Sequence, residues 1–350
     1  MGVLWALYFD YFQRSLAAFL IILGLSTVYL NTAAQTIGVC YGRNGDNLPP
    51  EAAAINLATA KGITAMRVYD PVPPVLDALR GADIQLVLGI PNADLPALSD
   101  PATANDWVNT VVLSNYPDVK FKYISVGNEV LPTTAPDAAN FLLPVMQNVY
   151  NALAAAGLQD VIKVSTATLQ SVLNNTYPPS ASVFADDVKT FLVPILQFLA
   201  ARNLPLLANV YTYFAYVSDP VSIPLPFALV DPAQPPNAAG YTNLFDASLD
   251  AFYYALAGAE FPGIDVVVSE TGWPSAGGEA AETENAVAYY RNIIAHVKGN
   301  AGTPFKPGKP IEAYLFAMFD EDLKTGAETE KHWGLFYPDQ TPKYPINFYD

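Results

Sequence analysis

Two glutamates follow strongly apolar segments in well-separated parts of the chain, where carboxyl groups can do acid–base or nucleophilic chemistry. Glu129 ends the segment KYISVGNE (122–129), and Glu270 lies near the end of DVVVSETG (265–272). A carboxyl after a buried segment enters a partly enclosed region, where it can donate a proton, accept one or attack an electrophile. A glutamate at a strand end is also often only a solvated charge, so this interpretation needs support from its surroundings.

Composition excludes several other kinds of site. The chain has one cysteine, Cys40, and two histidines, His296 and His332. A disulfide framework and a cysteine zinc site are therefore excluded, and a histidine-based triad or a multi-histidine metal site nearly so. The net charge of −16 would repel DNA, RNA and anionic membranes, but it would not repel a neutral polymer.

The elements that position the glutamates recur along the chain. Continuous apolar runs are typical of strands that are covered on both faces, as in parallel sheets. We predict eight such strands: 37–42, 65–70, 85–90, 122–129, 162–168, 206–214, 265–272 and 312–321. Helical patterns lie between them, and several end at a glycine, the expected helix stop. We predict helices over these segments: 50–62, 137–157, 186–203, 242–258 and 282–299.

Eight strands that alternate with helices predict one (β/α)₈ barrel, of the TIM-barrel class. A doubly wound open sheet is the alternative, but it favours a glycine-rich phosphate loop after the first strand. The first loop, CYGRNGDNLPP (40–50), contains no such motif. The proline-rich segment 215–240 cannot form one long helix, and we expect an elaborated loop or small subdomain there, after the sixth strand.

In such a barrel, Glu129 and Glu270 end the fourth and seventh strands and face each other across the mouth. Two facing carboxyls can cleave a glycosidic bond: one protonates the leaving oxygen, and the other attacks the sugar or activates water. A separation of about 5–5.5 Å gives retention and one of about 6.5–9.5 Å gives inversion; spacing along the chain leaves both open. The second strand ends in Arg67-Val68-Tyr69-Asp70, and the sixth in Asn209-Val210-Tyr211.

The first 35 residues resemble a secretory signal peptide. Arg14 precedes the apolar run SLAAFLIILGLSTVYL (15–30), and small residues follow near Ala34. A retained membrane anchor is the alternative, although the run is shorter than the ~20 residues of a spanning helix. We therefore expect residues 1–35 to be removed and residues 36–350 to form the barrel domain. The sequon at Asn174 matters if the chain is exported.

Several segments together resemble glycoside hydrolase family 17, the plant endo-β-1,3-glucanases and β-1,3-1,4-glucanases. They are IGVCYGRNGDNLPP, MRVYDP, YISVGNEV, VVVSETGWPSAGG, FDEDLKTG and WGLFYPDQTPKYPINF, and the resemblance spans 37–348. It implies a (β/α)₈ barrel, retaining chemistry and no cofactor. The implied activity is endo-hydrolysis of β-1,3-glucan. From the leader, the sequon and the last residues, which hold no apolar stretch, we expect a secreted glycoprotein without a lipid anchor, at the cell wall or secondarily in the vacuole. We expect a monomer.

The resemblance also implies roles for individual residues. Glu129 would be the general acid/base, Glu270 the nucleophile, and Asn128 a hydrogen-bond partner of the sugar 2-hydroxyl. The remaining positions implied to lie along the substrate are a charged cluster and a set of aromatics: Glu321, Lys324, Glu330, Tyr69, Tyr211 and Phe319. A cation beside the nucleophile would keep it ionised, and Lys324 is the expected one.

Four positions depart from the family pattern near this site. Asp320 and Asp322 replace asparagines, Thr212 replaces a common proline, and Trp333 replaces a frequent phenylalanine. The aspartates would add charge close to Glu321. They are the reason to keep a glucan-binding defence protein with little turnover as an alternative. A mixed-linkage glucanase and a transglycosylase that uses the same pair also remain alternatives.

Overall fold

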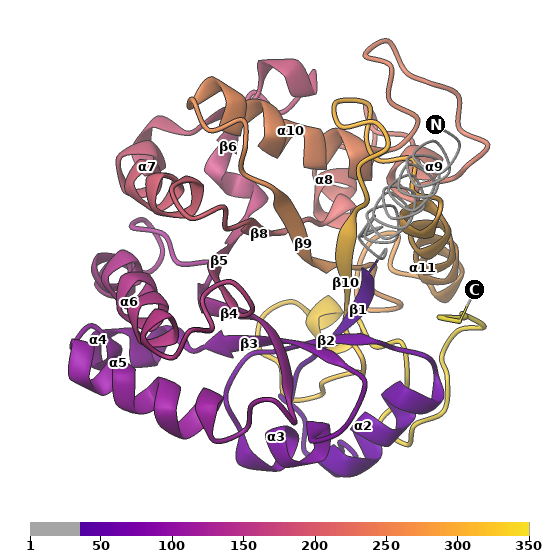
Figure 1. The fold of residues 1–350 in the computed structure, drawn as a ribbon. Coiled ribbons are helices and arrows are strands. Elements are labelled where there is room, and N and C mark those ends of the chain that lie inside the picture. Colours follow the sequence, from indigo (N-terminus) through magenta and orange to yellow (C-terminus); the bar gives the residue numbers. More distant parts are fainter. Residues whose placement is uncertain (1–35, 350) are drawn as a thin grey trace, which may run out of the picture. The chain divides into compact units, whose positions relative to one another are not determined.

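The computed structural model describes residues 36–349, and the predicted leader lies outside the described residues. Eight parallel strands close into a barrel in the order β1-β10-β9-β8-β5-β4-β3-β2 (Figure 1). Their bounds are β1 (Thr36–Tyr41), β2 (Ala65–Val68), β3 (Gln85–Ile90), β4 (Lys120–Asn128), β5 (Lys163–Leu169), β8 (Leu206–Asn209), β9 (Val266–Thr271) and β10 (Glu312–Phe316). The predicted (β/α)₈ barrel is confirmed, and the open sheet is excluded.

Helices lie outside the barrel and cover the strands, as Figure 1 shows for α6, α7, α10 and α11. The larger helices are α2 (Glu51–Ala60), α3 (Pro73–Leu79), α5 (Pro101–Trp107), α6 (Pro136–Ala155), α7 (Asp186–Ala200), α10 (Leu244–Gly258) and α11 (Thr283–Lys298). All five predicted helices are present. The segment between β3 and β4 also holds α4 (Leu95–Leu98), α5 and a π-helical turn, Val108–Leu113, which were not predicted.

Two predicted strands are too long. The sixth, predicted over 206–214, ends at Asn209, and α8 (Thr212–Ser218) begins in the same apolar run. The eighth, predicted over 312–321, ends at Phe316; beyond it the chain bonds to the segment around Trp333 instead of to β9. Both runs stay apolar because most side chains that follow the strand end, such as Tyr213 and Met318, are buried, so hydropathy alone does not mark the strand end.

The elaborated loop after β8 was predicted correctly. It contains α8 and a short helix, α9 (Leu225–Ala228), and it forms a small hydrophobic cluster of its own around Phe227 and Tyr241. A smaller hairpin, β6 (Leu173–Asn174) with β7 (Val183–Phe184), follows β5. Both insertions follow barrel strands at their carboxyl ends, the edge where active sites of such barrels lie.

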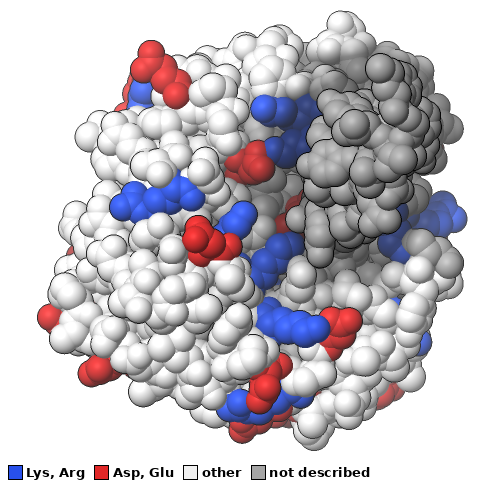
Figure 2. Space-filling model, in the orientation of Figure 1, with Lys and Arg blue, Asp and Glu red and all other residues white. Residues whose placement is uncertain are grey.

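No helix between residues 36 and 349 combines the length and hydropathy of a membrane span. On the face drawn in Figure 2, coloured acidic and basic side chains lie in small mixed groups with much uncharged surface between them.

Candidate active site

A cleft with a volume of ≈ 860 Å³ opens at the carboxyl ends of the barrel strands. Both predicted catalytic glutamates line it, together with every other predicted site residue except Phe319. The lining residues used below are Asn44, Arg67, Tyr69, Asn92, Asn128, Glu129, Tyr211, Phe214, Glu270, Phe316, Glu321, Lys324, Glu330 and Trp333.

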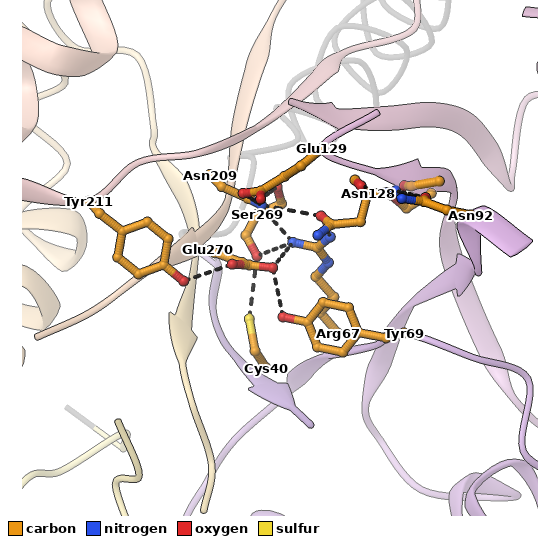
Figure 3. Close-up of polar contacts among 12 residues, drawn as sticks. Cys40, Arg67, Tyr69, Asn92, Asn128, Glu129, Asn209, Tyr211, Ser269 and Glu270 are labelled. Carbon is orange, nitrogen blue, oxygen red and sulfur yellow. Dashed lines mark hydrogen bonds and ion pairs between the residues drawn. The ribbon is translucent and has the colours of Figure 1, made fainter. Parts of the chain in front are cut away.

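Glu270 is held by three donors and is only 6% exposed. Its Oε1 accepts from Arg67 Nη1 and from the Tyr69 hydroxyl, both at 2.8 Å, and its Oε2 accepts from the Tyr211 hydroxyl at 2.7 Å (Figure 3). Burial raises the pKa of Tyr69 and of Tyr211 well above the ordinary value, so both hydroxyls stay protonated and donate. These three hydrogen bonds fix the plane of the Glu270 carboxylate.

Arg67 lies at the centre of the polar network, from β2 inside the barrel, and is 1% exposed. Besides Glu270, its Nη1 bonds to Asn209 Oδ1 at 2.9 Å and to the Ser269 carbonyl at 3.1 Å. Its Nη2 donates to Asn128 Oδ1 at 2.7 Å. One guanidinium therefore connects residues from four strands, β2, β4, β8 and β9, and sets their relative positions.

The backbone around Glu129 is in an uncommon conformation. Gly127 has a φ of 65° and Glu129 a φ of 54°, both in the left-handed region, which a non-glycine residue seldom occupies. The Asn92 side chain holds the residue between them: its Nδ2 donates to the Asn128 carbonyl, and its Oδ1 accepts from the Asn128 N–H. The Glu129 N–H donates to the Ala167 carbonyl of β5 at 2.9 Å. Such strain is typical of functional positions.

The environment of Glu129 favours its protonated form. Burial raises the pKa of this carboxyl, and the nearby charges of Glu270 and Glu330 raise it further. A hydrogen bond from Asn209 Nδ2 at 2.8 Å and the charge of Arg67 act in the opposite direction, without cancelling the rise. The two carboxyls therefore differ in the way that acid–nucleophile pairs require: Glu270 has three donors and Glu129 has one.

The predicted charged cluster lies on one side of the cleft. Lys324 Nζ is 3.7 Å from a carboxylate oxygen of Glu321 and 3.7 Å from one of Glu330, and it stands 4.2 Å from the Phe316 ring centroid. Glu321 is 3% exposed and accepts from the Asn44 N–H at 2.8 Å. Burial is the largest influence on Glu321 and raises the pKa of its carboxyl, although Lys324 opposes the shift.

The prediction that Phe319 lines the cleft was wrong. Phe319 is 1% exposed, lies outside the cleft lining, and packs against Tyr41 and Phe336, because β10 ends before it and the chain turns to pair with Phe336. Phe316, the last residue of β10, takes the cleft position instead. Phe214 also lines the cleft and is 45% exposed, so it offers an open aromatic face.

The expected cation beside Glu270 was also misassigned. Lys324 bonds within its own cluster, and Arg67 makes the ion pair with Glu270. The sequence places Arg67, Asn209 and Ser269 at predicted strand ends, but none of the three was assigned a role. The available signal was a charged or amide residue inside an otherwise apolar strand, since such a group is buried only with partners.

The two aspartates that depart from the family pattern do not add free charge to the cleft. Asp320 forms an ion pair with Lys343, whose Nζ lies 2.8 Å from both carboxylate oxygens and 2.8 Å from Ser275 Oγ. Burial lowers the pKa of Lys343, while Asp320 raises it. Asp322 is exposed and accepts from the Asp46 N–H at 3.2 Å.

The other two departures stabilise the wall of the cleft. Thr212, the first residue of α8, is buried and donates through Oγ1 to the Ala228 carbonyl of α9 at 2.8 Å, which a proline could not do. Trp333 is 2% exposed and packs edge-on against Tyr211, with ring centroids 5.3 Å apart, and beside Phe214 at 5.7 Å.

Among residues 36–349, no group of three or more His, Cys, Asp and Glu side chains has the arrangement of a metal site. What the site offers is a pair of carboxyls with different environments at the strand ends of a closed parallel barrel, which defines the class of barrel glycoside hydrolases.

Comparison with known proteins agrees with this class. The family model described as glycosyl hydrolases family 17 matches residues 37–348. A glucan endo-1,3-beta-glucosidase of Nicotiana tabacum is 53% identical over 346 residues, 98% of this chain and 98% of the relative. One of Vitis vinifera is 53% identical over 338 residues, 94% of this chain and 97% of the relative. The chain therefore belongs to glycosyl hydrolase family 17.

Solved structures give the same result. CJP38, described as a beta-1,3-glucanase and allergen of Cryptomeria japonica pollen, superposes with a TM-score of 0.85 and 45% identity, over 89% of this chain and 99% of that chain. A structure from work on two plant beta-glucan endohydrolases with distinct substrate specificities gives 0.83 and 43% identity, over 89% of this chain and 100% of that chain.

The Asp320–Lys343 pair generates a stability prediction. Asp320→Asn leaves the buried ammonium of Lys343 without its counter-charge, so the free energy of unfolding should fall by about 3 kcal/mol. Asp322→Asn, two residues away but exposed, should change it by less than about 0.5 kcal/mol. Urea unfolding of both variants measures the difference. Equal effects would contradict the assigned role of Lys343.

Proposed function

We propose that this protein hydrolyses β-1,3-glucosidic bonds within β-1,3-glucan chains by a double displacement. The observation that carries the proposal is the contrast between the two carboxyls: a carboxylate with three donors at Glu270, and a carboxyl with a raised pKa at Glu129. The family and the names of the relatives support the substrate class. The proposed enzyme acts as a monomer.

In the first step, Glu270 attacks the anomeric carbon while Glu129 gives its proton to the departing glycosidic oxygen. The C–O bond to the leaving chain breaks, and an ester bond forms between the sugar and Glu270. Arg67, Tyr69 and Tyr211 orient the attacking carboxylate. Their hydrogen bonds weaken as its charge is consumed, so they align the nucleophile more than they stabilise the product.

In the second step, water attacks the same carbon and Glu129, now ionised, accepts its proton. Loss of the Glu270 charge during the first step removes one cause of the raised pKa of Glu129, so the group can serve as a base. The ester bond breaks and Glu270 returns to its carboxylate form, which keeps the anomeric configuration over the full cycle.

The cleft suits a neutral polysaccharide. Apart from Glu129, its charged side chains form ion pairs: Arg67 with Glu270, Lys324 with Glu321 and Glu330, and Arg43 with Asp70. Asn128 Oδ1 is occupied by Arg67 and Asn209, so its amide N–H groups remain to donate to a sugar hydroxyl. The exposed ring of Phe214 and the edge of Tyr211 supply aromatic surface for the apolar face of a sugar ring.

Removal of either carboxyl tests the proposal. Glu270→Gln should abolish the release of reducing ends from a soluble β-1,3-glucan, because an amide cannot form the ester. Glu129→Gln should lower kcat on the same glucan roughly 10²–10⁴-fold, because the leaving oxygen is no longer protonated. It should spare the first step on an aryl glucoside whose leaving group departs without a proton.

A matched control is Glu279→Gln, an exposed glutamate outside the cleft, which should keep the activity of the unchanged protein. Full activity in Glu270→Gln would contradict the proposal. Binding of the glucan by folded, unmodified protein without cleavage would favour a glucan-binding role. Faster cleavage of a mixed β-1,3-1,4-glucan or formation of chains longer than the substrate would favour the other two alternatives.

We also propose that the chain is exported after cleavage of a signal peptide near residue 35 and that it acts outside the cell. Asn174 is exposed on the β6–β7 hairpin, outside the cleft, so a glycan there would leave the substrate path open. Expression of the full chain in a secreting plant or yeast host should give secreted protein that begins near Thr36 and carries a glycan that Asn174→Gln removes. A full-length N-terminus in the membrane fraction would contradict export with cleavage.

A further inference from the structure

Asn209, the last residue of β8, lies between the two catalytic carboxyls and is 1% exposed. Its Nδ2 donates to Glu129 Oε1 at 2.8 Å and to Asn128 Oδ1 at 3.2 Å. Its Oδ1 accepts from Arg67 Nη1 at 2.9 Å and from Ser269 Oγ at 2.8 Å (Figure 3). All of the donors and acceptors on this side chain therefore face residues of the catalytic network.

The orientation of the Asn209 amide is fixed by its neighbours. A guanidinium can only donate hydrogen bonds, so the atom that faces Arg67 Nη1 must be the amide oxygen. A flipped amide would place its NH₂ group against this donor and its oxygen against the acceptor at Glu129. Arg67 thus determines which end of the Asn209 amide is oxygen and which is nitrogen, and the N–H groups must point toward Glu129 and Asn128.

We propose that Asn209 is a positioning residue that selects which oxygen of Glu129 carries the transferable proton. An N–H donor bonds best to an oxygen that bears no proton, so the bond to Oε1 leaves Oε2 as the protonated atom. Oε2 accepts no hydrogen bond from the described residues, so it is the oxygen left for the substrate. This inference rests on the proposed function and adds a residue to it.

The same hydrogen bond serves the second step. Glu129 must be an acid first and a base afterwards, and an N–H donor at Oε1 stabilises the ionised form that accepts the proton from water. The charged groups that face Glu129 are Glu270 from β9, Glu330 from the short helix at 328–331, and Arg67 from β2. Among the hydrogen-bond donors of the described residues, Asn209 is the one that bonds this carboxyl directly.

The test uses two variants, Asn209→Ala and Asn209→Asp. Both remove the N–H donor, and Asn209→Asp keeps the volume and the acceptor for Arg67 and Ser269, which protects folding. The pKa of Glu129 should rise in Asn209→Ala, because a hydrogen bond to its carboxylate is lost, and should rise further in Asn209→Asp, because the new carboxylate also adds a like charge beside it. The basic limb of the kcat/KM–pH profile, which reports the protonated acid, should therefore move to higher pH.

Two substrates separate a positioning role from a structural one. On β-1,3-glucan, kcat/KM at the pH optimum of the unchanged protein should fall roughly tenfold to a hundredfold, as expected for loss of a hydrogen bond to a charged group. On an aryl glucoside with a good leaving group, the first step needs no acid and should change much less.

The two proposals fail in different ways. An unshifted basic limb in both variants, with equal losses on both substrates, would overturn the role of Asn209 and leave the carboxylate mechanism intact. An unmodified protein that cleaves neither substrate would instead contradict the proposed function itself. An upward shift of the basic limb, with a loss confined to the glucan, supports the inference.

Discussion

The buried guanidinium of Arg67 is the interaction on which the rest of the site depends. Taking a cation and a carboxylate out of water costs several kcal/mol for each ion, and the structure offsets this only with close, well-directed partners. Glu270, Asn209, Asn128 and the Ser269 carbonyl are those partners. Because they come from three other strands, β4, β8 and β9, one side chain on β2 fixes the distances between the carboxyl ends of these strands.

The barrel makes this arrangement possible because eight parallel strands present all of their carboxyl ends at one edge. Buried side chains of the barrel interior pack directly beneath the polar network around Arg67. Cys40 is one of these side chains: its thiol donates to the Ser269 carbonyl, and burial raises its pKa, so it stays a neutral packing group. Within residues 36–349, the polar network faces the cleft, and buried side chains such as Cys40 pack beneath it.

Much of this could be predicted from the sequence. Continuous apolar runs and glycine stops gave the strand number, the helices and the strand ends that carry Glu129 and Glu270, because periodicity reports burial. Hydropathy could not locate the ends of β8 and β10, because buried apolar residues continue past both strands. For that reason Phe319 was wrongly predicted to line the cleft. Nor could hydropathy pair Arg67 with Glu270 or Asp320 with Lys343, since partners distant in the chain meet only through the barrel's closure.

The central claim is that Glu270, held by Arg67, becomes covalently bonded to the sugar. The most direct measurement is peptide mass spectrometry after reaction with an activated 2-deoxy-2-fluoro β-glucoside, whose fluorine slows the second step. The account predicts a single fluoroglycosyl ester on Glu270 and a parallel loss of activity. An ester on another residue, or no ester while glucan cleavage releases the inverted anomer, would contradict it.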